Sequence, residues 1–203
     1  MKISSKIEVC NLALSRIGQN SISSLEDDSS VQAQFCNMVY EQSKSALLAQ
    51  YNWTFAISSA KLVKVDNTED DFKEYTYKYA LPEGFLRLMC LYDNNNHEIV
   101  PVPNTKPIFK LEGKYIFSDF SDCKLKFIKD MDAVAEFSPM FIDCFVLDLA
   151  IRLTKLFNNS STYLQQLQME YLQQIAKAKI SDCQQTELSG IQSYPILFST
   201  WAF

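Results

Sequence analysis

Residues 138–157 read SPMFIDCFVLDLAIRLTKLF, and this stretch decides the fold that the sequence predicts. Pro139 suits the first turn of a helix, where its missing N–H costs nothing. The apolar residues that follow do not form a single stripe, and they include Phe141, Phe145, Leu149, Leu153 and Leu156. A helix that is apolar on more than one face is buried. We therefore expect this segment at the centre of a helical bundle.

Two amphipathic segments precede it near the N-terminal end of the sequence. The first covers about residues 5–17, where Ser5 and Glu8 have the spacing of a capping box and Gly18 suits the position after the last turn. The second begins near the acidic pair at residues 27–28 and runs to about Tyr51. Both patterns favour helices that pack one face on the central segment.

A final amphipathic segment covers about residues 161–182. One face is apolar and consists of Leu164, Leu167, Tyr171, Ile175 and Ala178. The other face is rich in glutamine, with Gln165, Gln168 and Gln173 as the candidates for contact with a partner. Two interpretations stay open for this second face, which is either solvated or an adaptable polar contact surface.

Residues 61–131 differ in character from both flanks, because short period-two runs and turn signals replace the helical spacing. We expect a hairpin over residues 109–117 and a last strand over residues 124–129. The predicted fold class is α+β, mainly α. A bundle of about four helices, from residues 1–60 and 132–183, would carry a small β-rich insert, residues 61–131, and an extended C-terminal arm, residues 184–203.

The predicted arm is unusually apolar and has a single charged side chain, Glu187. Its candidate contact residues are Tyr194, Phe198, Trp201 and Phe203. Fully burying one large apolar side chain gains about 1.5–3 kcal/mol, so we expect such a segment to be covered. It either folds back on its own domain or packs on a neighbouring subunit or partner protein.

Composition excludes several classes of function. The net charge of −5 argues against a general DNA-binding protein, which needs a face rich in Lys and Arg. The six cysteines lack zinc-site spacing, and we expect buried thiols at Cys10, Cys36 and Cys144. No apolar run is long enough to span a bilayer, and the first residues do not look like a signal peptide, so we expect synthesis in the cytoplasm.

Catalytic signatures are also absent from the sequence. His97 is the one histidine, and its place after a run of asparagines is typical of a solvated turn. No phosphate-binding glycine motif occurs among the four glycines. The carboxylates at residues 27–28 and 69–71 fit a helix cap and a solvated loop. We therefore predict a protein that is not an enzyme and that has no cofactor, catalytic residue or metal site.

Three stretches together resemble the phage tail tubular protein A family, the head-to-tail adaptors of short-tailed phages. They are residues 11–18, NLALSRIG, which lead to Ser24-Leu25 and the acidic pair; Leu47-Leu48 followed by Trp53-Thr54-Phe55; and Tyr79-Ala80-Leu81-Pro82 followed by Leu86-Arg87. The order and spacing of the stretches carry the resemblance, which covers about residues 7–182.

This resemblance implies a virion protein of the tail connector. It would form a homo-oligomeric, dodecameric ring between the phage portal protein and the tail nozzle protein, with genomic DNA passing through without sequence-specific binding and no membrane contact. The rival interpretations are a non-viral helical protein-interaction module and a small ligand-binding domain.

Overall fold

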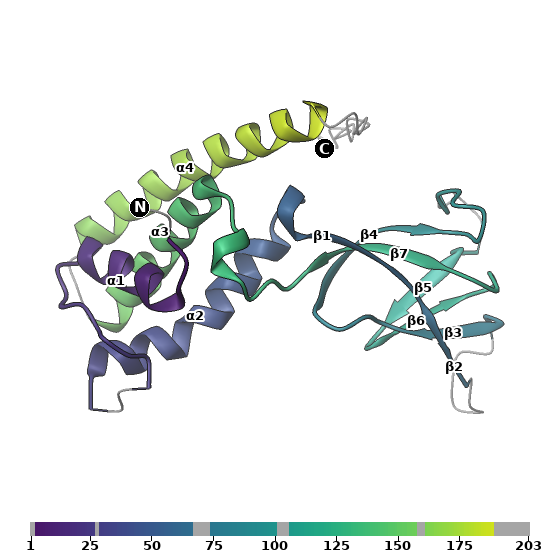
Figure 1. The fold of residues 1–203 in the computed structure, drawn as a ribbon, viewed down its shortest axis with the longest axis horizontal. Helices are drawn as coiled ribbons and strands as arrows, with labels where there is room; N and C mark the ends of the chain where they lie inside the picture. The colour runs from purple at the N-terminus through teal and green to yellow at the C-terminus, as the bar shows by residue number, and fades with distance from the viewer. Residues whose placement is uncertain (1–2, 27–28, 67–73, 101–105, 158–160, 189–203) are drawn as a thin grey trace, which may run out of the picture. The chain divides into compact units, whose positions relative to one another are not determined.

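A computed structural model describes residues 3–26, 29–66, 74–100, 106–157 and 161–188, with side chains described to residue 184 of the last stretch. The described chain divides into two compact units. Unit 1 comprises residues 1–40 and 135–203, and unit 2 comprises residues 41–134. Figure 1 labels their helices and strands.

Unit 1 is helical. It contains α1 (Lys6–Arg16), the first part of α2 (Val31–Ala49), α3 (Pro139–Leu156) and α4 (Ser161–Leu188). The predicted capping box is confirmed: Glu8 N donates to Ser5 Oγ at 3.2 Å, and Ser5 N donates to Glu8 Oε2 at 3.0 Å. Gly18 adopts a φ of 69°, a conformation that glycine reaches without steric cost, and it ends α1.

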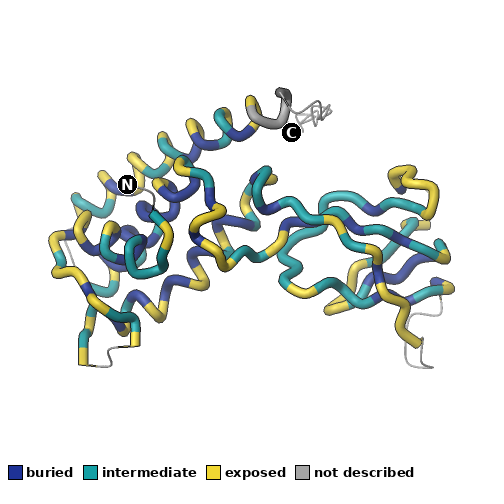
Figure 2. Tube along the Cα trace, in the orientation of Figure 1, coloured by how far each residue is buried: buried dark blue, intermediate teal, exposed yellow. Residues whose placement is uncertain are grey.

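The central position predicted for residues 138–157 is confirmed within unit 1. Ser138 Oγ accepts a hydrogen bond from Phe141 N at 3.2 Å, and Pro139 occupies the first turn of α3. Both α1 and α4 pack against α3. Its fully buried side chains include Phe141, Cys144, Phe145, Leu149 and Leu153. Figure 2 shows this burial along the helix.

Unit 2 contains the second part of α2, a 3-10 turn (Thr54–Ala56) and seven strands. The strands form two antiparallel sheets, in the orders β1-β7-β4 and β2-β3-β6-β5. Their bounds are β1 Ile57–Lys61, β2 Val63–Val65, β3 Tyr77–Ala80, β4 Phe85–Tyr92, β5 Phe109–Glu112, β6 Tyr115–Ser118 and β7 Lys124–Lys129. The predicted hairpin and last strand are confirmed, and Gly113 takes a φ of 57° between β5 and β6.

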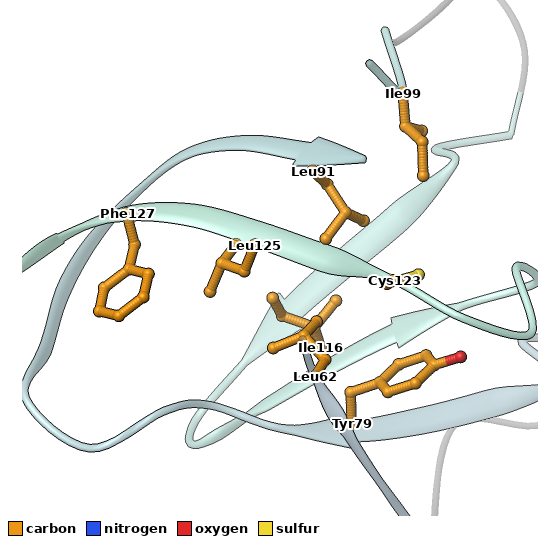
Figure 3. Close-up of a cluster of buried hydrophobic side chains, with 8 residues drawn as sticks. All are labelled: Leu62, Tyr79, Leu91, Ile99, Ile116, Cys123, Leu125 and Phe127. Atoms are coloured by element: carbon orange, nitrogen blue, oxygen red, sulfur yellow. The ribbon is translucent and has the colours of Figure 1, made fainter. Parts of the chain in front are cut away.

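The two sheets share one apolar core, which Figure 3 draws. Tyr79 and Ile116 are cross-strand partners in one sheet, and both are fully buried. Leu125 and Phe127 are two residues apart in β7, so their side chains point to the same side of the strand and into the core. Eight buried residues make up this core: Leu62, Tyr79, Leu91, Ile99, Ile116, Cys123, Leu125 and Phe127.

The predicted fold class, a mainly helical bundle with a small β-rich insert, is wrong. Among the described residues the fold is α+β, with four helices and two antiparallel sheets of seven strands in all. The β-rich part is not a small insert, because seven strands in two sheets enclose a core of their own. The predicted arm begins differently as well, since α4 continues past residue 182 to Leu188.

Candidate interaction surface

Helix α4 presents one face to α3 and leaves the opposite face open. On the inner face Leu167, Ile175 and Ala178 are 2%, 8% and 1% exposed. This agrees with the apolar face predicted from the sequence. Arg16 of α1 also fixes the helix, because its Nη1 donates to Glu170 Oε1 at 2.9 Å. The inner face therefore accounts for the position of α4 in unit 1.

The outer face of α4 carries an apolar stripe whose side chains are exposed and so do not pack on α3. Met169, Leu172 and Ile180 are 60%, 60% and 61% exposed. With Ala176, which is also exposed, they follow 3-4-4 spacing and so lie along one side of the helix. The exposed charged residues Glu170 and Lys177 border this side of the helix. We define the outer face of α4 by seven exposed, uncharged residues: Gln165, Gln168, Met169, Leu172, Gln173, Ala176 and Ile180.

The glutamines predicted as contact residues belong to this face. Gln165, Gln168 and Gln173 are all exposed and flank the stripe. Fully burying a large apolar side chain gains about 1.5–3 kcal/mol, so covering three that are already about 40% buried gains roughly 3–5 kcal/mol. The sequence interpretation noticed the polar residues and missed the stripe between them, although its spacing was readable. The other predicted contact residues, Tyr194, Phe198, Trp201 and Phe203, lie outside the described residues.

Unit 1 also has shallow open hollows over α1 and α3. One, of about 420 Å³, is lined by Ile3, Glu8, Asn11 and Leu12. A second, of about 250 Å³, is lined in part by Leu12, Arg16, Asp143 and Glu170. Burial raises the pKa of Asp143 above its ordinary value, and Gln174 Nε2 donates to its Oδ2 at 3.3 Å. Both hollows carry charged side chains.

A buried lysine of unit 2 lies among three carboxylates. The Lys44 side chain is 1% exposed, and its Nζ lies 2.6 Å from Asp132 Oδ1, 2.8 Å from Glu41 Oε2 and 3.2 Å from Asp130 Oδ1. Burial opposes protonation of Lys44, but hydrogen bonds with the three carboxylates outweigh burial and raise its pKa above the ordinary lysine value. A fully charged ammonium therefore ties the second part of α2 to the chain that follows β7. We call these four residues the Lys44 cluster.

Sequence reasoning could not find the Lys44 cluster, since 88 residues separate Lys44 from Asp132. The cluster has the properties of a structural centre. An ammonium held by three carboxylates stays protonated, whereas a lysine that acts as a base or nucleophile needs a lowered pKa.

The one histidine of the sequence lies in an exposed turn of unit 2. His97 is 79% exposed, and its Nδ1 lies 3.5 Å from Asp93 Oδ2. Asp93 Oδ1 accepts backbone hydrogen bonds from Asn95 and His97, each at 2.8 Å, which confirms the solvated turn predicted here. Among the described residues no three His, Cys, Asp or Glu side chains are grouped to hold a metal ion.

The cysteines behave as the sequence predicted. Cys10, Cys36 and Cys144 are buried thiols, and no disulfide joins any of the six cysteines, all of which lie in the described chain. Within the described residues, no helix combines the length and the apolarity that a membrane crossing demands.

Comparison with known proteins adds no family assignment. No family model matches the chain, and a search of curated proteins finds no match. The outer face of α4 groups three large apolar side chains that are each about 60% exposed, and we take it as the candidate interaction surface.

Proposed function

We propose that the chain is a structural subunit of a short-tailed phage, a head-to-tail adaptor that forms a ring between the portal and the tail nozzle. Such a subunit works by forming interfaces, with DNA passing through the ring. Its interfaces would use the outer face of α4 and the segment that carries Tyr194, Phe198, Trp201 and Phe203. The proposal includes no catalytic step, cofactor or metal.

The outer face of α4 is the single observation that carries this proposal. Exposed apolar side chains scattered singly are common on soluble proteins, but contiguous ones mark contact sites. Met169, Leu172 and Ile180 follow one side of a long helix and are flanked by uncharged, hydrogen-bonding glutamines. Apolar centres with polar rims are characteristic of protein–protein interfaces.

Residues of two of the stretches that carry the family resemblance form hydrogen bonds to the end of α2. Trp53 is fully buried, and its Nε1 donates to Leu47 O at 2.9 Å. Arg87, from the third motif stretch, donates from Nε to Ala49 O at 3.0 Å. Two motif stretches separated in sequence therefore meet at the end of α2. This contact gives a structural reason for their joint occurrence and supports the resemblance.

The acidic balance of the chain is compatible with the passage of DNA. With a net charge of −5, the subunit does not attract phosphate in general, and a ring of such subunits would limit adhesion of DNA to its walls. Phosphate binding instead requires clustered Lys and Arg. A strongly basic channel in an assembled ring would contradict this part of the proposal.

Binding to portal rings tests the proposal directly. The purified chain is mixed with a panel of portal proteins from short-tailed phages, and the mass and image of any complex are recorded. We expect a ring of subunits on a portal. We expect Met169→Glu to weaken the assembly about tenfold per subunit contact, since an apolar contact worth about 1.4 kcal/mol is lost.

Met38→Glu is the matched control for this experiment. Met38 lies in α2, is 65% exposed, and receives the same substitution away from the outer face of α4. Equal losses in the two variants would remove the outer face of α4 from the interface. Failure of the parent chain to bind every portal would overturn the adaptor function and favour an interaction module unrelated to phages.

A further inference from the structure

We draw no further inference here: the strongest candidate, the exposed apolar stripe of Met169, Leu172, Ala176 and Ile180 on the outer face of α4, carries nothing beyond the proposed function because nothing in the structure shows what covers it.

Discussion

Replacing Lys44 by methionine tests whether the Lys44 cluster stabilises unit 2. The substitution keeps a buried apolar stem and removes the ammonium that Glu41, Asp130 and Asp132 surround. We expect Lys44→Met to lower the free energy of unfolding of unit 2, because three carboxylates lose their shared cation. The size of the loss depends on how well water can replace that cation at each carboxylate.

The exposure of each carboxylate sets the magnitude. Glu41 and Asp132 are 55% and 82% exposed, so each of these ion pairs contributes about 0.2–1 kcal/mol. Asp130 is 30% exposed and its Oδ1 is buried, so leaving that oxygen without its cation costs about 1–3 kcal/mol. The ammonium no longer has to be desolvated, which offsets part of the loss. We expect a net destabilisation of about 2 kcal/mol for Lys44→Met, and about 2 kcal/mol more for Lys44→Ala, which also removes the stem.

Urea unfolding followed by Trp53 fluorescence measures this loss. A Trp201→Phe background leaves Trp53, which is in unit 2, as the sole tryptophan. With a slope of about 1–3 kcal/mol per molar urea, the midpoint should fall by about 1 M in Lys44→Met. Lys177→Met, a change at an exposed lysine of α4, should leave it within about 0.5 kcal/mol of the parent. A Lys44→Met protein as stable as its parent would refute the reasoning, since it would show that the buried ammonium adds nothing.

Three further predictions use the same unfolding measurement or circular dichroism. Trp53→Phe loses the buried indole hydrogen bond and some packing, and should cost about 2–4 kcal/mol; a loss below 1 kcal/mol would contradict it. Gly18→Ala places a side chain at a φ of 69° with open space around it, so strain alone should lower the thermal stability by about 1–2 kcal/mol. A hydrogen bond from the Thr76 backbone N–H, with Lys106 nearby, lowers the pKa of Asp119. Its stabilising effect is therefore present above the ordinary aspartate pKa and lost as the pH falls below about 4, and Asp119→Asn should weaken this dependence.

Local sequence patterns predicted the ends and centres of several elements. The capping box at Ser5, the turn at Gly18 and the burial of Phe141 and Phe145 follow from spacing and backbone preference alone, because neighbours in sequence determine them. The strand over residues 124–129 was likewise readable from its composition. Each of these features is local.

The predicted fold class failed where distant segments had to be combined. Strands of three to eight residues look like minor pieces of an insert when each is judged alone. Their importance comes from pairings such as Ile57 with Ile128 and Tyr77 with Ser118, which build two sheets around one core. The Lys44 cluster could not be predicted either, because its residues come from segments that are far apart in the sequence. Of the candidate interaction surface, the glutamines were predicted, and the stripe was not.

Strand β2 illustrates a feature that protects the chain from unwanted polymerisation. It is an edge strand of three exposed residues, Val63, Lys64 and Val65, and in the described sheet it pairs only with β3. Edge strands invite pairing with other molecules, and a lysine in such a strand discourages it. The ammonium group of Lys64 lies 4.8 Å from the centre of the Tyr77 ring, on the neighbouring strand β3. Lys64→Val would leave three successive valines along an open edge, and fibril formation under storage would then become the main hazard in handling the protein.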